Sequence, residues 1–252
     1  MTGDGVNDAP ALKQAEVGIA VNSATDVAKA AASAVLTGEG LGNIVDLIKV
    51  GRMIHERILT WIFNKVVKTL ETQVFVIVAF FLTGRFVVSA FDMVLLLLLI
   101  DFITLTISTD NTRWSRKPNV WNITGVTRTA VVIGVVVTVE SLILLYIGMR
   151  YFGMSAGVLH TYAFAILFYF GTINVFVVRE RGHFWQSFPS RTLFLTILAD
   201  MVLVGVLVTA GLPSLTPIPP AAALTILVFC LFCALGLNDP LKYRLLKGSR
   251  EP

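Results

Sequence analysis

Residues 1–15, MTGDGVNDAPALKQA, place two aspartates and two glycines directly before a segment of helical character. Gly3 and Gly5 flank Asp4, so the backbone can turn tightly there and come close to a ligand. Asp4 and Asp8 carry the hard oxygen ligands that Mg²⁺ prefers. Asp8 is also suited to cap a helix that begins directly after it. The residues alone therefore leave two interpretations open for Asp8, a helix cap and a metal ligand.

The composition places most of the chain in a lipid bilayer. Of its 252 residues, 56% are hydrophobic and 14% are charged, and the mean hydropathy is +0.79. An ordinary soluble domain is far less apolar than this. The formal charge of +4 comes from short basic clusters between apolar segments, which is a pattern of membrane topology. We therefore expect a membrane protein that does not bind nucleic acid.

The chain divides near Gly40. Before this point the pattern predicts two helices and two short buried strands, with the helices at 9–16 and 25–32 and the strands at 17–21 and 33–37. Some forty residues cannot close a doubly wound sheet around a core of their own. We therefore interpret residues 1–40 as the C-terminal piece of a cytosolic α/β domain and expect its other strands upstream of Met1.

After Gly40 the pattern becomes helical and then continuously apolar. Residues 41–60 are amphipathic and predict a stalk helix that continues into a first membrane span ending near Thr83. Such a rigid helix could carry a rotation into the bilayer, whereas the alternative is a soluble helix that merely adjoins a span. Residues 61–237 hold six predicted spans, the later ones at 92–108, 129–151, 160–178, 192–211 and 221–237.

Basic clusters alternate with poorly charged loops along these spans and predict that both chain ends are cytoplasmic. The loops lie around Ser89, Ala156 and Pro217. The clusters are Arg113, Arg116, Lys117 and Arg128, then Arg179, Arg181 and Arg191, and last Lys242, Arg244, Lys247 and Arg250. Residues 238–252 are accordingly predicted to be a cytosolic tail.

Carboxylates inside the spans are the next functional signal, because a charge at mid-bilayer is costly unless it is paired or hydrated. Counting residues from the outer loop places Glu71 and Asp101 near the bilayer middle, where they could face one another. Asp101 is the sharper candidate, since a lone carboxylate can take a proton from one side and release it to the other. An ion pair with Lys65 or Lys68 is the alternative for Asp101.

Three other carboxylates receive less specific interpretations. Glu71 and Lys68 are three residues apart on a helix, so an internal salt bridge is as well supported as ion ligation. For Glu140 and Asp200 we favour packing partners over transport ligands. The sequence thus nominates Asp101, Glu71 and Lys68 for ion transport.

The first forty residues also resemble a known family. TGDGVNDAPAL at residues 2–12, KQAEVGIAV at 13–21 and TDVAKAAASAVL at 25–36 are similar to the hinge segment of the phosphorylation domain in P-type cation-transporting ATPases. A weaker resemblance continues in the membrane part, through GR-x-I-x-x-R at 51–57 and IDFITLTISTD at 100–110. These two stretches look most like plasma-membrane proton pumps of that family.

The resemblance implies a fold, a cofactor and site residues. The fold is an α-helical membrane protein with six transmembrane helices, preceded by a partial phosphorylation domain of the haloacid-dehalogenase-like, Rossmann type. Asp4 becomes a Mg²⁺ ligand beside a phosphorylated aspartate, with Asn7 and Asp8 shaping the same catalytic site. Asp101 matches the aspartate that accepts the proton. The complete pump would hydrolyse ATP with Mg²⁺ in the plasma membrane.

The sequence departs from the proton pumps at three positions. They carry asparagine and glycine on either side of the aspartate, where this chain has Ile100 and Phe102, and they carry arginine at the position of Glu71. Leu105 argues against a calcium site, which needs six to eight oxygen ligands. A pump for another cation (Mg, Ca, K or Na) therefore stays an alternative to proton export.

Several family motifs do not occur in the 252 residues. These are the DKTGT phosphorylation motif, the TGE motif, the nucleotide-binding domain and the earlier membrane helices. We therefore expect this chain alone not to hydrolyse ATP, and we expect the missing N-terminal part of the pump to be its partner. The alternative is a non-catalytic membrane remnant or accessory module.

Overall fold

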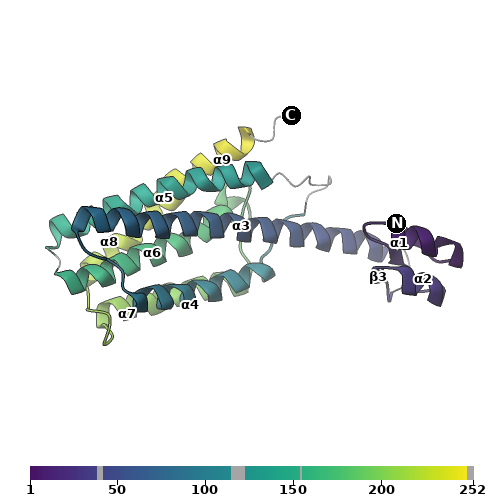
Figure 1. Cartoon of the computed structure of the whole chain (residues 1–252), viewed down its shortest axis with the longest axis horizontal. Coiled ribbons are helices and arrows are strands. Elements are labelled where there is room, and N and C mark those ends of the chain that lie inside the picture. Colours follow the sequence, from purple (N-terminus) through teal and green to yellow (C-terminus); the bar gives the residue numbers. More distant parts are fainter. Residues whose placement is uncertain (39–41, 115–122, 154, 249–252) are drawn as a thin grey trace. The chain divides into compact units, whose positions relative to one another are not determined.

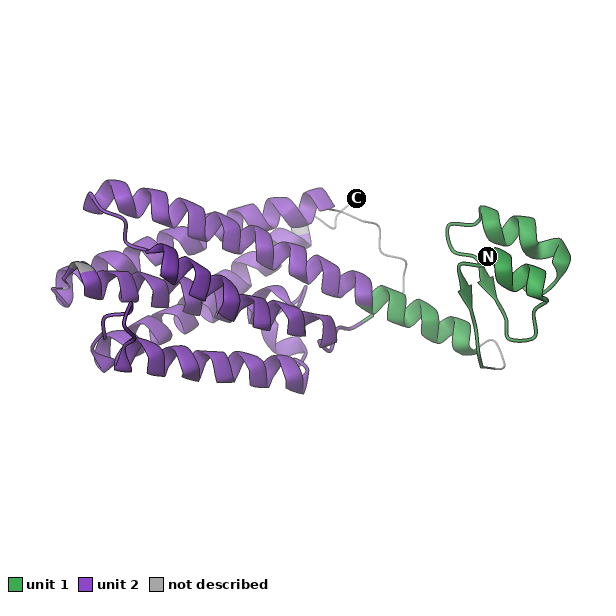
Figure 2. Cartoon of the chain, turned by 60° about the horizontal axis from the view of Figure 1, so that its bottom comes forward, with its two compact units in different colours: residues 1–53, 114–118 green, residues 54–113, 119–252 purple. Residues whose placement is uncertain are grey.

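The computed structural model describes residues 1–38, 42–114, 123–153 and 155–248. By their internal contacts these residues form two compact units (Figure 2): residues 1–53 with 114–118, and residues 54–113 with 119–252. The predicted domain boundary at Gly40 lies outside the described residues, as do the basic residues Arg116, Lys117 and Arg250.

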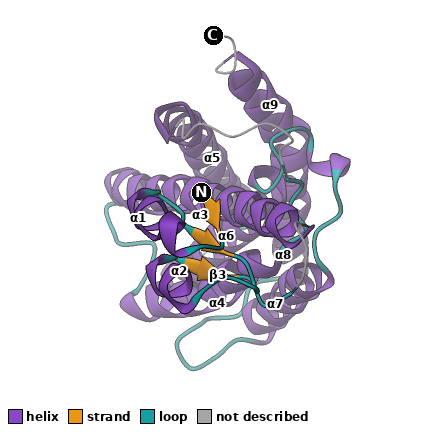
Figure 3. Cartoon of the chain, turned by 90° about the vertical axis from the view of Figure 1, so that its right-hand side faces the viewer, coloured by secondary structure: helices purple, strands orange, loops and turns teal. Residues whose placement is uncertain are grey.

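The first unit contains a three-stranded parallel sheet with short helices (Figure 3). Its strands are β1 (Thr2–Gly3), β2 (Ile19–Ala20) and β3 (Ala34–Val35), and β2 is central. Between them lie η1 (Val6–Asp8), α1 (Ala9–Gln14) and α2 (Asp26–Ala31). The two predicted helices and two predicted strands are therefore present, each somewhat shorter than the sequence pattern indicated.

Strand β1 was not predicted from the sequence. Thr2 lies opposite Ile19 and Gly3 opposite Ala20, and the amide of Ile19 donates to the carbonyl of Met1 at 2.9 Å. Thr2 and Gly3 stand next to Asp4 and Gly5 without an apolar run around them, unlike β2 and β3, so the sequence pattern carries no signal for this strand.

A small apolar cluster holds this unit together. Leu12 of α1 packs with Ala20, Ala24 and Ala28, and all four side chains are buried. Gly18 comes so close to the carbonyl of Leu12 that a Cβ atom could not fit there. The helices can therefore approach the sheet closely because small residues face it.

Six helices among the described residues are long and apolar enough to cross a bilayer, as predicted. They are α3 (Gly42–Thr83), α4 (Ala90–Thr106) continued by η2 (Ile107–Thr109), α5 (Ile123–Tyr151), α6 (Ala156–Val178), α7 (Arg191–Ala210) and α8 (Pro220–Leu231) with its continuation. The predicted stalk and first span are one helix, α3. A short η3 (Phe184–Gln186) precedes α7.

Helix α6 occupies the centre of the second unit (Figure 1). Of its apolar window 94% is buried, against 28 to 50% for the other five spans. The contact between α5 and α6 is close, since a Cβ atom on Gly148 would overlap the ring of Tyr162. Helices α4, α5, α7 and α8 therefore all pack against α6.

The last helical segment extends beyond the predicted span end at Leu237. α8 continues through the π-helix η4 (Phe232–Asn238) into α9 (Asp239–Gly248). Lys242 is fully buried, and its ammonium donates to the carbonyls of Val177 and Glu180 and to Asp239. The first half of the predicted cytosolic tail is thus a packed helix, because Lys242 finds acceptors at the end of α6.

A buried ion pair fixes the ends of two helices in this unit. The guanidinium of Arg179, just after α6, binds the carboxylate of Asp110, just after η2, with Nε–Oδ2 at 2.8 Å and Nη2–Oδ1 at 3.2 Å. The same carboxylate accepts the amide of Ser190, which is the N-cap residue of α7. Arg57 of α3 donates twice to the carbonyl of Asp110. Asp110 therefore joins the ends of η2, α6 and α7 to the side of α3.

We predict that Arg179→Met destabilises the second unit by about 3–5 kcal/mol, because it leaves a buried carboxylate without its cation. Lys49→Ala is the control, since Lys49 pairs with Asp46 on the surface and an exposed pair contributes about 0–1 kcal/mol. Thermal unfolding of the chain in detergent, followed by circular dichroism, measures both. Equal shifts for the two variants would contradict a structural role for Arg179.

Candidate functional site

Asp8 closes the loop that follows β1. Its Oδ2 accepts the backbone amides of Asp4 at 3.0 Å and Gly5 at 3.1 Å. These two hydrogen bonds, that of Gly5 first, hold the pKa of the Asp8 carboxyl below its ordinary value. A Cβ atom on Gly3 would lie 2.6 Å from the Cβ of Asp8, so the loop needs glycine at that position.

The side chain of Asp8 does not cap the helix that follows it. Asp8 stands at the N-cap position of α1, but its side chain makes no capping bond to that helix. Instead it reaches back to the preceding loop, because η1 turns the chain before α1 begins. Asp8 therefore occupies the expected N-cap position, but its side chain does not make the expected hydrogen bond to α1. Its carboxylate binds the preceding loop instead.

Asp4 and Asn7 lie where a ligand could reach them. Asp4 directly follows β1, and its side chain is exposed, as is that of Asn7. In open parallel sheets, ligands bind beyond the carboxyl ends of the strands. Among the described residues, no group of three or more His, Cys, Asp or Glu side chains is placed to hold a metal ion. The assignment of Asp4 to a Mg²⁺ site therefore stays a prediction.

Glu71 is fully buried between helices of the second unit. Its Oε1 accepts the hydroxyl of Ser141 of α5 at 3.1 Å, and its Oε2 lies 3.5 Å from the ammonium of Lys68. Lys68 also donates to the carbonyl of Leu167 of α6. The ammonium also lies against Gly171 of α6, where a Cβ atom would come within 2.6 Å of Nζ. Lys68 therefore fits into the bundle because α6 has no side chain at that point.

This arrangement answers the question left open for Glu71. Lys68 and Glu71 form the internal salt bridge expected from their spacing. Glu71 is held by α3 and α5 together, and both of its oxygens have partners. The pair is thus a neutral unit inside the apolar bundle.

Asp101 does not face Glu71. Its side chain is 57% exposed, and its Oδ1 pairs with the ammonium of Lys65 at 3.1 Å. The prediction that the two carboxylates face one another is therefore wrong, whereas the alternative ion pair is present, with Lys65 as the partner. Helix α4 buries Ile100 and Ile103, whereas Asp101 lies on the outer side of the bundle.

The hydroxyl groups near Asp101 do not bind its carboxylate. Thr104 donates to the main-chain carbonyl of Asp101 at 3.1 Å, and Ser108 donates to that of Leu105 at 2.7 Å. Hydroxyls on apolar helices commonly satisfy themselves in this way. The ion pair that the structure describes at this position therefore consists of Asp101 of α4 and Lys65 of α3.

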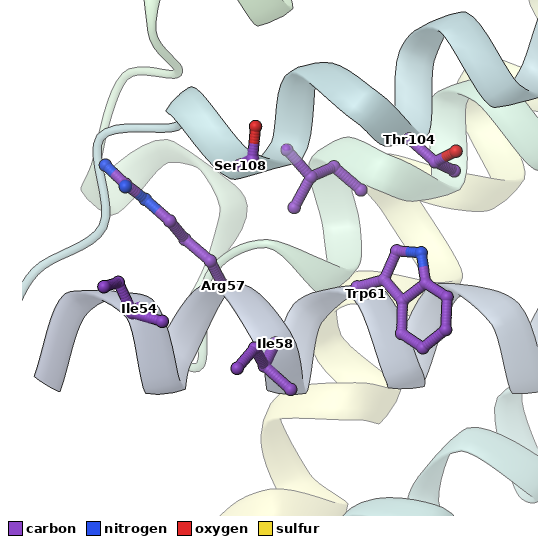
Figure 4. A pocket seen from close by; sticks show the side chains of 7 residues that line it. Ile54, Arg57, Ile58, Trp61, Thr104 and Ser108 are labelled. Carbon is purple, nitrogen blue, oxygen red and sulfur yellow. The ribbon is translucent and has the colours of Figure 1, made fainter. Parts of the chain in front are cut away.

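A pocket of about 250 Å³ opens between α3 and α4 (Figure 4). Apolar groups form most of its wall, with Trp61 and Ile58 on α3 and Thr104 and Ser108 on the other helix. Arg57 of α3 lines it as well and donates to the carbonyl of Asp110. Asp101 is not among the lining residues, so the pocket is adjacent to the ion pair and does not contain it.

Sequence reasoning missed two polar contacts between distant parts of the chain. His183 is 2.8 Å from Asp239 and stacks between the rings of Trp185 and Tyr243 at 4.4 and 4.3 Å. Glu140, expected to be a packing partner, accepts the amide of Asn238 at 2.9 Å. Neither contact could be read from spacing, because its members are 56 and 98 residues apart.

Both parts of the chain are similar to known proteins. Residues 1–40 match the family model of haloacid dehalogenase-like hydrolases. Over 248 residues the chain is 34% identical to the protein MJ1226 of Methanocaldococcus jannaschii, provisionally named a cation-transporting ATPase; the match covers 98% of this chain and 31% of that protein. It is 31% identical over 265 residues to the plasma membrane ATPase of Neurospora crassa, covering 100% of this chain and 29% of the relative.

Plasma membrane ATPase 1 of Schizosaccharomyces pombe is 33% identical over 209 residues, which are 81% of this chain and 22% of the relative. The chain therefore spans less than a third of the length of the curated relatives it matches.

A double-mutant cycle tests the neutral unit of Lys68 and Glu71. Lys68→Met should cost about 3–5 kcal/mol of stability, since it leaves the buried carboxylate without a cation. Lys68→Met combined with Glu71→Leu should recover most of that loss, because an apolar pair of similar volume needs no compensation. Chemical unfolding of these two variants, of Glu71→Leu alone and of the parent chain in detergent measures the coupling. Losses that simply add would show that the two side chains do not act as a pair.

Proposed function

The chain is homologous over its whole length to P-type cation-transporting ATPases, and from this we propose that it serves as the ion-translocating part of such a pump. The complete pump couples aspartyl-phosphate formation and Mg²⁺-dependent ATP hydrolysis to cation export. Residues 1–40 contribute to the phosphorylation domain, and the six apolar helices contribute the membrane domain. The upstream part of the pump supplies the remaining catalytic groups. The exported cation is a proton.

Asp4 is the residue of this chain that we assign to Mg²⁺. Its exposure at the carboxyl end of β1 supports the assignment, and so does the loop closure by Asp8, which sets the direction of Asp4 without the metal. When bound, Mg²⁺ neutralises charge on a transferring phosphoryl group. Asn7 and Asp8 shape the same catalytic loop, with Asp8 acting through the backbone amides that it accepts.

The pair of Asp101 and Lys65 is the observation that supports proton transport. The two groups are 3.1 Å apart and both are partly accessible, so a proton can reach the carboxylate. An ammonium and a proton compete for the same carboxylate, because each neutralises its charge. Withdrawal of Lys65 allows Asp101 to take up a proton, and the return of Lys65 drives the proton off.

The salt bridge of Lys68 and Glu71 has a separate role in this proposal. Lys68 lies on the same helix as Lys65, about one turn further along. Its pairing with Glu71 keeps that second carboxylate from competing for the transported ion. Helix α3 is continuous from Gly42 to Thr83, which supports a coupling role for the stalk. The orientation follows the basic clusters, so both termini are cytoplasmic and the pump resides in the plasma membrane.

We predict that Asp101→Asn abolishes proton transport by the complete pump, because an amide cannot release a proton to the opposite side. ATP-driven acidification of sealed vesicles measures this. Asp46→Asn is the matched control, since Asp46 makes only a surface pair in α3, and it should acidify vesicles at the rate of the unaltered pump. Normal acidification by Asp101→Asn would remove Asp101 from the mechanism.

A second variant addresses the catalytic loop. Asp4→Asn should raise the Mg²⁺ concentration needed for phosphoenzyme formation by roughly tenfold or more, the usual consequence of a weakened metal site. Phosphoenzyme is measured from labelled ATP over a series of Mg²⁺ concentrations. An unchanged Mg²⁺ dependence would exclude Asp4 as a ligand.

A further inference from the structure

Two acceptor oxygens lie unpaired beside an existing hydrogen bond between α5 and η4. Asn238 Nδ2 donates to Glu140 Oε2 at 2.9 Å. Among the described residues, the other oxygen of each side chain, Glu140 Oε1 and Asn238 Oδ1, has no hydrogen-bond partner. Glu140 is only 6% exposed and Asn238 is fully buried. Unpartnered buried acceptors are costly, so this pair calls for a group that both oxygens can bind.

A neighbouring cation does not meet this need. Glu140 takes part in no ion pair among the described residues. The ammonium of Lys68 is bound to Glu71 and to a carbonyl of α6, and that of Lys242 is bound to Asp239 and to two carbonyls. The remaining titratable neighbour is the thiol of Cys233, a weak hydrogen-bond donor that contacts the Glu140 carboxyl.

A proton on Glu140 resolves the arrangement. A neutral carboxyl group donates through its hydroxyl and accepts through its carbonyl, and a carboxamide donates through its NH₂ group and accepts through its carbonyl. With the proton on Oε1, Glu140 donates to Asn238 Oδ1 while Asn238 Nδ2 continues to donate to Oε2. All four groups are then satisfied and the pair carries no net charge, which an apolar bundle favours.

We propose that Glu140 and Asn238 form a proton-binding site, a cyclic carboxyl–carboxamide pair that joins α5 to the π-helix η4. The position of Asn238 supports this, since it is the last residue of η4 and π-helical turns often occur at functional sites. The site is independent of the Lys65–Asp101 pair. Its proton stays in place at neutral pH and locks the last helical segment against α5.

Infrared spectroscopy of the 252-residue chain in detergent tests the site at about pH 7. We expect a protonated-carboxyl stretching band that shifts on labelling glutamate with ¹³C at the carboxyl and disappears in Glu140→Gln. Gln at this position keeps both hydrogen bonds, so this variant should unfold within a few degrees of the parent. Loss of an ionised carboxylate band instead of a protonated one would overturn the proposal.

Two further measurements separate the proton from other ligands and identify the partner. Asn238→Leu should move the band to higher frequency, since the carboxyl hydroxyl loses its acceptor; an unmoved band would remove Asn238 from the site. Glu71→Gln is the matched control and should leave the band in place. A band that changes between sodium and potassium salts would show a bound metal cation in place of the proton. The isotope shift, read on the unaltered chain, assigns the band to a glutamate, and the comparison of Glu140→Gln with Glu71→Gln then identifies which of the two buried glutamates carries the proton.

Discussion

Charged groups inside apolar helices must find partners at fixed distances, and this requirement organises the second unit. Lys68 satisfies it through Glu71 and a carbonyl of α6, and Lys242 through Asp239 and two carbonyls at the end of α6. Arg179 satisfies it through Asp110. In a bundle without water each such group costs several kcal/mol when unpaired. The positions of the helices therefore depend on where these few ions meet.

Helix α6 is the element on which most of these contacts converge. It offers main-chain carbonyls rather than charged side chains, through Leu167 and Val177, and it remains apolar along nearly its whole length. A carbonyl accepts from an ammonium without adding a second buried charge. The central helix can thus hold two lysines in place while the carboxylates stay on α3 and α9.

Much of the fold could be predicted from the sequence, because long apolar runs and their basic flanks are strong signals. The six spans and two of the three strands were predicted correctly. The direction in which Asp101 points was not, since LLLLLIDFITL is apolar on every side and conveys no helical phase. The partner of Glu140 was equally hidden, because Asn238 is contributed by a helix far away in the chain. Pairings between distant helices depend on packing, which single-sequence patterns do not encode.

The π-helix η4 has a consequence for how this chain tolerates change. A π-turn contains one residue more than an α-turn, so Asn238, Asp239 and Lys242 occupy faces that an uninterrupted α-helix would not give them. Removal of one residue from 232–238 would convert the segment to ordinary α-helix and rotate everything beyond it by about 100°. Such a deletion would turn the buried ammonium of Lys242 away from α6 while leaving the hydrophobicity of the span almost unchanged. Length in this segment is therefore under tighter constraint than composition.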